Sequence, residues 1–409
     1  MLHVKRRNFI KALSGTSLLS LTGGLSLSNT ALAASKNQVA EGTVITLLTQ
    51  PYLQHPTAEG ITICWITSKP AHSWVEYWEE NTSEKKVKKQ TIEDGMALAN
   101  NMTNRIRLDK LQGGKRYRYK VFSKEIIEFL PYKKTFGDTV ESAEFSFVTV
   151  SPHKESVSML ILNDIHDRPH SFAHLEKLHG SKAYDEVFLN GDMFDYQTDQ
   201  QQLIDHLIAP CTALFASEKP FLFVRGNHET RGIFTYQLKH YFENIGNAPY
   251  FSFSRGPVFF IALDTGEDKE DDHEAYYGMA AFDPFREEQA QWLDKILQTE
   301  EAKKALYRVV LMHIPPYHSG DWHGTTHCRK VFSPVFEKYQ ISLVVSGHTH
   351  RYGVHLAQTD HSYPIVIGGG PIEGNRTAIK LTANSQQLQL TMLLDDGKEV
   401  GSLVLKPDQ

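Results

Sequence analysis

Five apolar segments of this chain each end on side chains that bind metal ions in proteins. The segments are short and rich in β-branched residues, and stretches with helical periodicity separate them. Such a pattern is typical of buried strands in a layered α/β domain. Ligands of these folds bind beyond the carboxyl ends of the strands, so the five ends are expected to meet at one place. The acids, amides and imidazoles found there offer the oxygen and nitrogen donors that manganese, iron and zinc prefer.

The residues at the five ends form ordered motifs. They are Asp-x-His from Asp164, Gly-Asp-x-x-Asp from Gly191, Gly-Asn-His-Glu from Gly226, a lone His313 and Gly-His-x-His from Gly347. One such motif is weak evidence, but five in this order are specific. Over residues 155–409 they resemble the calcineurin-like metallophosphoesterases. The resemblance implies an α/β (α+β) layered sandwich with mixed central sheets, and a metal-dependent phosphoric ester hydrolase.

The resemblance also implies a ligand set for two divalent metal ions. A carboxylate bridges the pair and three further side chains complete each ion, and manganese, iron and zinc all suit these donors. Matched to this sequence, the bridge is Asp192, the first ion takes Asp164, His166 and His350, and the second takes Asn227, His313 and His348. A chain with 20 histidines places some at strand ends by chance. Chance explains one lone histidine, but not the ordered set.

Two further residues are predicted to act in catalysis. His228 follows the ligand Asn227 and should face the substrate, where it donates a proton to the leaving oxygen or binds the phosphoryl group. In related phosphatases an acid at the position of Asp195 hydrogen-bonds that histidine, which fixes its tautomer and raises its pKa. The alternative for Asp195 is a carboxylate on a solvent-facing loop. Glu229 is expected to orient neighbouring groups rather than to react.

The loop after His313 contains three histidines that are candidates for substrate contact. They are His318, His323 and His327. Similar loops in purple acid phosphatases line the substrate pocket, and a histidine near the position of His323 assists proton transfer there. We therefore predict a catalytic role for His323, with a surface histidine as the alternative.

The metal motif departs from that of purple acid phosphatases. Those enzymes have a tyrosine where this chain has Asp195, and a glycine within the Asp-x-x segment that here ends in His166. An imidazole thus takes the coordination place of a phenolate. The loss of that hard anionic ligand weakens the case for obligate Fe(III) and favours Mn(II), Zn(II) or Fe(II).

Residues 43–150 contain short strand candidates without long helices, among them 44–48, 61–67 and 74–78, which is typical of an all-β sandwich. The run from Leu111 to Val121 resembles a fibronectin type III turn, in which a tyrosine near the start of a strand bonds back to the backbone. Residues 50–54 resemble the opening of the β-domain that precedes the catalytic domain in purple acid phosphatases. A polar connection at residues 151–156 therefore separates an Ig/fibronectin III-like domain from a metallophosphoesterase domain at 156–409. Helices of the second domain are expected at 171–178, 201–216, 234–244 and 284–297.

Residues 1–33 are predicted to be an export signal. A basic segment with Arg6 and Arg7 precedes an uncharged stretch that ends in Ala31-Leu32-Ala33, which is the order of a signal peptide. The adjacent arginines resemble the twin-arginine type, with an ordinary secretory signal as the alternative. Serines and glycines interrupt the apolar stretch, so no stable membrane span is expected. The protein is predicted to be periplasmic or extracellular.

The charge balance opposes general binding to nucleic acid. The chain has 43 basic and 48 acidic residues. Residues 1–33 hold four basic residues and no acid, so the remainder has 39 against 48, a net −9. Nucleic-acid-binding proteins need a basic face, and the predicted partner is a small phosphoester instead. The three cysteines are expected to be buried thiols rather than a disulfide framework.

These observations predict an exported dinuclear-metal phosphoesterase that hydrolyses phosphate esters with a metal-activated hydroxide. Phosphomonoesters are favoured, because the β-domain and the loop after His313 resemble purple acid phosphatases. A phosphodiesterase or nucleotide hydrolase is one alternative, since the same metal pair cleaves those esters. A non-enzymatic surface-binding protein with structural metals is the other, and it leaves His228 and Asp195 without a purpose.

Overall fold

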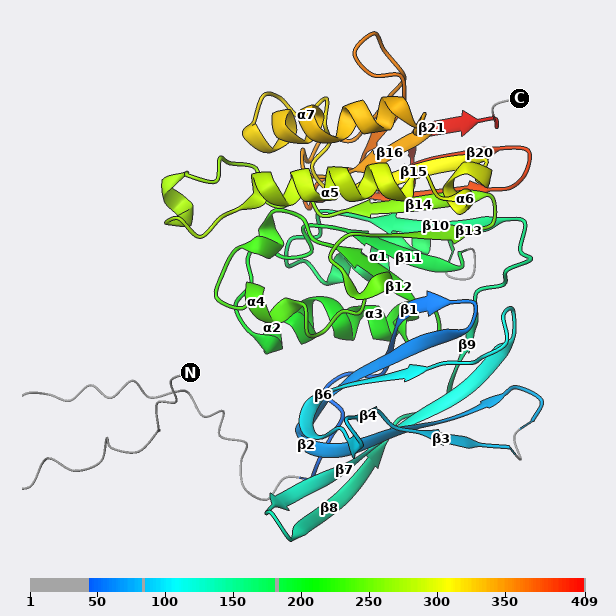
Figure 1. Ribbon diagram of the computed structural model, residues 1–409, viewed down its shortest axis with the longest axis vertical. Coiled ribbons are helices and arrows are strands. Elements are labelled where there is room, and N and C mark those ends of the chain that lie inside the picture. Colours follow the sequence, from blue (N-terminus) through cyan, green and yellow to red (C-terminus); the bar gives the residue numbers. More distant parts are fainter. Residues whose placement is uncertain (1–43, 83–84, 181–183, 408–409) are drawn as a thin grey trace, which may run out of the picture. The chain divides into compact units, whose positions relative to one another are not determined.

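The computed structural model describes residues 44–82, 85–180 and 184–407 of the chain. The predicted export signal lies outside these residues. Figure 1 shows a β-rich part, which holds strands β1–β9, and a layered part, which holds β10–β21 and the helices. None of the helices in the described ranges is long and apolar enough to cross a lipid bilayer.

The β-rich part is built on one seven-stranded sheet with two long strands. The path runs β1-β2-β7-β8, with β3 and β6 paired to β2 and β9 paired to β7. The strands are β1 (Tyr52–Thr57), β2 (Gly60–Glu79), β3 (Val87–Lys89), β6 (Ala99–Leu108), β7 (Arg116–Phe129), β8 (Lys134–Glu141) and β9 (Phe145–Val148), beside a small hairpin of β4 (Ile92–Glu93) and β5 (Met96–Ala97). The first half of β2 pairs with β1 and β6 and its second half with β7. Their inward side chains surround the fully buried Trp65.

The strands of the β-rich part differ in extent from those that the sequence predicts. The strands expected at 61–67 and 74–78 are the two ends of β2, because β-branched and aromatic residues continue the pairing through the residues between them. Residues 44–48 form only an isolated bridge from Leu47 to Thr67. The expected tyrosine contact is present: the Gln112 N–H donates to Tyr117 Oη at 3.0 Å. The likeness to fibronectin type III stays a prediction.

The layered part contains two six-stranded mixed sheets. Their orders are β12-β11-β10-β19-β20-β21 and β13-β14-β15-β16-β18-β17. Strands β10–β12 are parallel in the first sheet, and β14, β15, β16 and β18 are parallel in the second. The strands are β10 (Val157–Leu162), β11 (Glu186–Asn190), β12 (Phe221–Val224), β13 (Phe251–Arg255), β14 (Val258–Leu263), β15 (Tyr307–Met312), β16 (Leu343–Ser346), β17 (Gly353–His355), β18 (Ile365–Ile367), β19 (Thr377–Ala383), β20 (Leu388–Leu394) and β21 (Glu399–Leu405).

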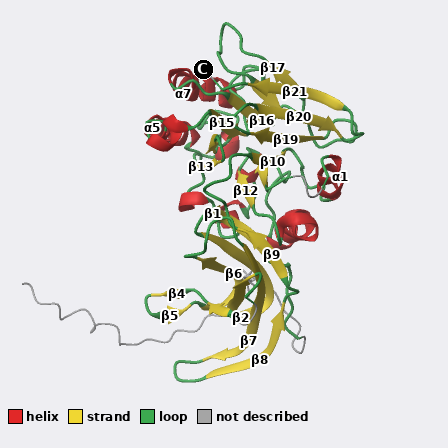
Figure 2. Cartoon of the chain, turned by 90° about the vertical axis from the view of Figure 1, so that its right-hand side faces the viewer, coloured by secondary structure: helices red, strands yellow, loops and turns green. Residues whose placement is uncertain are grey.

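Helices cover the outer faces of both sheets. They are α1 (His170–Leu178), α2 (Gln200–Leu203), α3 (Ala209–Cys211), α4 (Thr235–Leu238), α5 (Phe282–Ile296), α6 (Glu300–Lys304) and α7 (His323–Lys338). Figure 2 shows the strands between α5 and α7 on one side and α1 on the other. One apolar core lies between the two sheets. Each sheet also has a second core on its other face, where the helices pack. The predicted layered fold with mixed sheets is confirmed.

The helices follow the predicted pattern in part. The helix expected at 201–216 is a run of α2, a π-helical turn at Ile204–Ile208, α3 and a second π-helical turn at Thr212–Ala216. The helix predicted at 234–244 is only the single turn α4 in the structure, so that prediction is wrong for the residues after Leu238. The sequence reading missed α7, because its first turn is polar and Pro334 interrupts the helical pattern.

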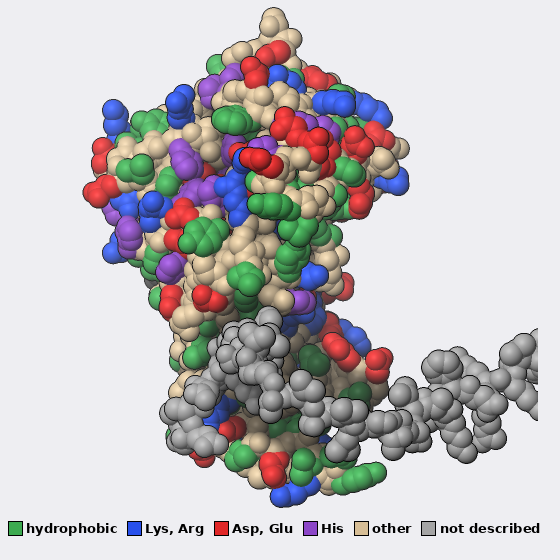
Figure 3. Space-filling model, turned by 90° about the vertical axis from the view of Figure 1, so that its left-hand side faces the viewer, with side chains coloured by type: hydrophobic (Ala, Val, Ile, Leu, Met, Phe, Trp, Pro, Cys, Tyr) green, Lys and Arg blue, Asp and Glu red, His purple; other side chains and the backbone are tan. Residues whose placement is uncertain are grey.

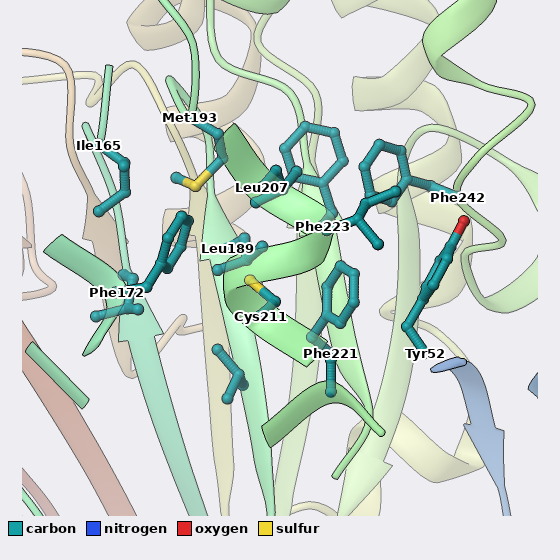
Figure 4. Close-up of a cluster of buried hydrophobic side chains, with 14 of the residues drawn as sticks. Tyr52, Ile165, Phe172, Leu189, Met193, Leu207, Cys211, Phe221, Phe223 and Phe242 are labelled. Carbon is teal, nitrogen blue, oxygen red and sulfur yellow. The ribbon is translucent and has the colours of Figure 1, made fainter. Parts of the chain in front are cut away.

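The β-rich part is joined to the layered part by buried polar contacts. Tyr52 of β1 donates to the carbonyl of Tyr241 at 2.8 Å, and the Gln54 amide donates to that of Phe221 at 2.8 Å. Tyr119 of β7 donates to the carbonyl of Ser217 at 2.7 Å. Figure 4 shows Tyr52 beside the side chains of the core that β11 and β12 form with the helical run at 200–216. All three cysteines lie in the described chain as buried free thiols.

Candidate metal centre

The predicted ligands follow the carboxyl ends of five parallel strands. Asp164 and His166 come after β10, Asp192 after β11, Asn227 after β12, His313 after β15, and His348 and His350 after β16. The first three strands belong to one sheet and the last two to the other. Because the sheets pack face to face, their ends meet. Figure 3 shows histidine side chains gathered on one face of the layered part.

The backbone that carries these ligands turns sharply. Five of the seven predicted ligands have a positive φ, which ordinary residues seldom adopt: Asp164 (53°), His166 (49°), Asp192 (55°), His348 (71°) and His350 (55°). Such strain persists only where the surrounding structure enforces it, and it concentrates at functional sites.

Two glycines allow the turns to approach one another. A Cβ on Gly191 would lie 2.6 Å from the backbone nitrogen of Gly226 and from His313 Nδ1, and a Cβ on Gly226 would lie 2.2 Å from Asp192 Oδ1. No side chain fits at either position. The glycines of the Gly-Asp and Gly-Asn motifs are therefore required for the ligands to converge.

The convergent side chains form two donor groups that share Asp192. One group contains Asp164, His166, Asp192 and His350, and the other contains Asp192, His313 and His348. In the first, His350 Nε2 lies 3.3 Å from Asp164 Oδ1 and 3.0 Å from His166 Nε2. In the second, His313 Nε2 lies 2.9 Å from Asp192 Oδ2. Asn227 joins the second group, because its Oδ1 lies 3.0 Å from His348 Nδ1.

The imidazole tautomers fit a metal ion. The Asp195 carboxylate lies 2.8 Å from His166 Nδ1, and the Asn190 carbonyl lies 2.9 Å from His313 Nδ1. Both oxygens can only accept a hydrogen bond, so each Nδ1 carries a proton, and Nε2 is the nitrogen that would give up its proton and offer a lone pair to a metal ion. His313 Nε2 is buried and makes no hydrogen bond. This is the arrangement in which histidines coordinate a metal through Nε2.

The field inside the groups is that of two ionised carboxylates. Burial by itself raises the pKa of Asp192, but the neighbouring His313 outweighs it and lowers the pKa to about 2. The pKa of Asp164 is also lowered, with His166 and His350 outweighing burial. Conversely, burial by itself lowers the pKa of His313, but Asp192 raises it to about 10. The groups attract positive charge, as a metal site must.

The fully buried Glu229 holds the turns at Gly191 and Gly226 together through their backbone. Its carboxylate accepts hydrogen bonds from the backbone nitrogens of Asp192 at 2.9 Å, Met193 at 2.7 Å and Gly226 at 2.7 Å. Burial and the charge of Asp192 raise the pKa of Glu229 to about 7. The residue thus orients the two glycine turns, as predicted from the sequence.

The contact between His228 and Asp195 differs from the predicted one. His228 Nδ1 donates to the backbone carbonyl of Asp195 at 2.6 Å, whereas the Asp195 carboxylate binds His166. The reason is geometric: the loop after β11 turns its carbonyl toward His228 and its side chain toward β10. The pKa of His228 is lowered, chiefly by burial, and not raised as predicted.

Arg231 and Glu267 belong to the site although the sequence reading passed over them. Arg231 Nη1 donates to His228 Nε2 at 3.0 Å, and its other nitrogens pair with Glu267 at 2.5 and 3.0 Å. Glu267 is buried. The position of Arg231, three residues after a predicted catalytic histidine, was the available signal. Glu267 begins the acidic run of residues 267–272, which the sequence predicts to be a solvated loop.

His323 lies at the start of α7 and pairs with α5. Its Nε2 lies 2.9 Å from both carboxylate oxygens of Asp283, and its ring stacks on His327. Within the described ranges its side chain makes no polar contact with either donor group. The predicted catalytic role is therefore not supported by its partners, since the contact with Asp283 holds the imidazole against α5. His318 instead faces His361, with their Nε2 atoms 3.0 Å apart.

Comparison with known proteins gives the same family for these motifs. Residues 157–352 match the family model of the calcineurin-like phosphoesterases. Probable purple acid phosphatase 20 from Arabidopsis thaliana is 29% identical over 59% of this chain and 58% of its own length. The purple acid phosphatase of Glycine max is 24% identical over 76% of this chain and 66% of its own length. The chain thus spans somewhat more than half of the length of these relatives.

Solved structures show the same fold at low identity. The purple acid phosphatase PPD1 from yellow lupin seeds superposes with a TM-score of 0.66 and 17% identity, over 88% of this chain and 74% of its own. The structure of PhoD superposes with a TM-score of 0.61 and 13% identity, over 88% of each chain. Because 88% of this chain is more than residues 157–409 contain, the likeness includes strands of the β-rich part.

Proposed function

Residues 157–352 belong to the calcineurin-like phosphoesterase family, and from this premise we propose that the chain is a phosphatase that hydrolyses phosphate esters at a dinuclear metal centre. The observation that supports this best is the pair of donor groups that share Asp192. Two ions about 3.5–4 Å apart need one anionic ligand in common, with further donors on each side. A mononuclear or purely structural site has no need of the second group.

We assign the donors as the sequence predicts. Asp164, His166 and His350 would hold one ion, Asn227, His313 and His348 would hold the other, and Asp192 would serve both. When bound, two divalent cations supply a water of near-neutral pKa and neutralise charge on the phosphoryl oxygens. The imidazole of His166, in the place of a phenolate, favours Mn(II), Zn(II) or Fe(II). One relative is named an Fe(3+)-Zn(2+) purple acid phosphatase, and of these two ions the donor set of this chain favours the zinc.

The chain's other residues hold the donors and handle the leaving oxygen. Asp195 and the Asn190 carbonyl keep His166 and His313 in the ligating tautomer. His228 lies beside the centre, with Nε2 4.0 Å from Asp192 Oδ2. Its Nε2 accepts from Arg231, so only after Arg231 turns away can Nε2 take up a proton from water and pass it to the leaving oxygen. Phosphoryl oxygens are acceptors, and they would draw the guanidinium from His228 as substrate binds.

Phosphomonoesters are the favoured substrates in this proposal. The similarity to several purple acid phosphatases supports the preference. Paired assays with an aryl phosphate and the corresponding bis-aryl phosphate separate this reading from a phosphodiesterase. We expect kcat/KM to be higher for the monoester. A higher value for the diester would reverse the substrate assignment and leave the metal centre in place.

The division of the chain also remains a proposal. We place the boundary at residues 151–156, because β1–β9 pair only among themselves and β10 begins a different sheet. The exported location rests on residues 1–33 alone. Sizing and sequencing the mature protein from its native cell tests it, and an intact first residue on a cytoplasmic protein would contradict it.

A further inference from the structure

An open cavity of about 1210 Å³ lies beside the metal centre. Its walls come from the segment around α4, the loop that leads into α5, the end of β12 and Arg105 of β6. Its volume exceeds the usual range of small-ligand pockets, about 300–1000 Å³. No residue of the two donor groups lines it. The cavity therefore has room for a ligand that extends well beyond a phosphoryl group.

Two side chains form a common wall between the cavity and the metal centre. Arg231 and Glu267 both line the cavity. On the other side, Arg231 Nη1 lies 3.0 Å from His228 Nε2. The cavity thus begins one side chain away from the group that we assign to the leaving oxygen. Once Arg231 turns from His228 toward the phosphoryl group, as proposed above, a substrate held at the donors could direct its leaving group past Arg231 into this space.

Aromatic side chains form part of the lining of the cavity. Phe223, Phe242, Phe282 and Phe285 contribute rings, and Tyr236 and Met279 expose 68% and 74% of their surface to solvent. Large side chains this exposed in one place mark binding sites more often than bare surface. Flat aromatic walls favour a planar ring system as the occupant.

The cavity is also basic, although the whole chain is acidic. Five cationic side chains line it, Arg105, Arg225, Arg231, Lys239 and Lys269, against the two acids Glu243 and Glu267. Arg225, Arg231 and Lys269 are paired with carboxylates. Arg105 and Lys239 form no ion pair within the described ranges, and they remain available to a ligand. An anionic group on the occupant would satisfy them.

We infer that this cavity receives the leaving group of the ester, and that the preferred substrates are phosphomonoesters whose leaving group carries a fused aromatic system and an additional negative charge. The inference rests on the proposed phosphatase function, and it names the class of ester that this function acts on. The metal donors and Arg231 bind the phosphoryl end, the aromatic walls bind the ring system, and Arg105 and Lys239 bind the added charge.

The test compares three aryl phosphates with the metal-loaded full chain: phenyl phosphate, 2-naphthyl phosphate and a sulfonated 2-naphthyl phosphate. We expect kcat/KM to rise about tenfold from phenyl to naphthyl, as burial of one further ring predicts. A further rise of about threefold to tenfold is expected on adding the sulfonate, and added salt should shrink it. Equal kcat/KM for all three esters would overturn the inference.

Charge reversal at Lys239 tests the basic wall. Lys239→Glu is expected to lower the ratio of kcat/KM between the sulfonated and the plain naphthyl ester by about tenfold. Lys406→Glu is the matched control, because Lys406 is an exposed lysine near the end of β21 and outside the cavity. Identical ratios in the two variants would contradict the assignment. Ala275→Trp should narrow the cavity and lower the ratio of kcat/KM for 2-naphthyl phosphate to kcat/KM for phenyl phosphate.

The outcomes also separate this inference from the proposed function. Turnover of all three esters without discrimination would keep the phosphatase and reject the cavity as its leaving-group site. No turnover of any ester, with manganese, iron or zinc added, would reject the phosphatase and the inference with it.

Discussion

The Nδ1 atom of His228 lies 2.6 Å from the backbone carbonyl oxygen of Asp195 and donates its proton there. A carbonyl oxygen can only accept, so this contact fixes the tautomer of His228 with a lone pair on Nε2. Because the acceptor belongs to the backbone, substitutions of the Asp195 side chain leave it in place. The Asp195 carboxylate acts on His166 instead, 2.8 Å from Nδ1.

Asp195→Ala is therefore expected to weaken metal binding. Loss of a carboxylate that orients a ligating histidine typically lowers metal affinity about 10- to 100-fold. Competition against a chelator of known affinity measures this. Asp205→Ala, at another exposed acid in the π-helical turn, should leave affinity unchanged. Unaltered affinity together with a large fall in kcat would show that the carboxylate acts on the substrate.

His228→Ala should retain both metal ions and lose turnover. The expected fall in kcat is about 10²–10⁴-fold, the range for a general acid. The fall should be largest for esters with poor leaving groups, which depend most on protonation. Steady-state kinetics with a series of aryl and alkyl phosphates measures it, with His153→Ala as an exposed control. Full turnover on alkyl phosphates would remove the assignment.

Arg231→Gln should destabilise the protein as well as slow it. Glu267 is buried and would lose its partner, and Arg231 is partly exposed, so we expect a loss of about 1–3 kcal/mol in the free energy of unfolding. Urea titration measures it. The double variant Arg231→Gln/Glu267→Gln should recover part of the loss, because no unpaired charge remains. A double variant no more stable than Arg231→Gln would argue against the pair.

Glu243 links the two parts of the chain and makes their stability depend on pH. Burial by itself raises the pKa of Glu243, but hydrogen bonds from His55 and Thr62 outweigh it and lower the pKa. A folded pKa below the unfolded value of about 4.3 stabilises the fold above that pH, and the stabilisation is lost as pH falls further. The difference in unfolding free energy between the wild type and Glu243→Gln should therefore be present at pH 6 and shrink below about pH 4. A difference that does not vary with pH would contradict this.

The sequence predicts the centre well because its motifs lie at strand ends. The apolar strands before Asp164, Asp192 and His313 are short and unambiguous, and parallel pairing brings their carboxyl ends together. Local residues and their order thus contain most of the information on the donors. The layered fold follows from the same strands.

Contacts between distant loops could not be predicted in this way. Either the carboxylate or the backbone carbonyl of Asp195 could face His228, because the two groups are only a few bonds apart. The direction of the turn decides between them, and the sequence does not give that direction. The pairing of His323 with Asp283 depends on the packing of α7 on α5, which no local pattern of the sequence determines. Glu267 looks like a solvated acid until Arg231 is placed beside it.

The central claim is that Asp192 is shared by two metal ions on which hydrolysis depends. The most direct measurement is elemental analysis of the wild type and of Asp192→Asn, both purified without chelator, with turnover of an aryl phosphate in the same samples. We expect about two divalent ions per wild-type chain, and loss of both metal and turnover in Asp192→Asn. An Asp192→Asn protein that keeps two ions and wild-type turnover would contradict it.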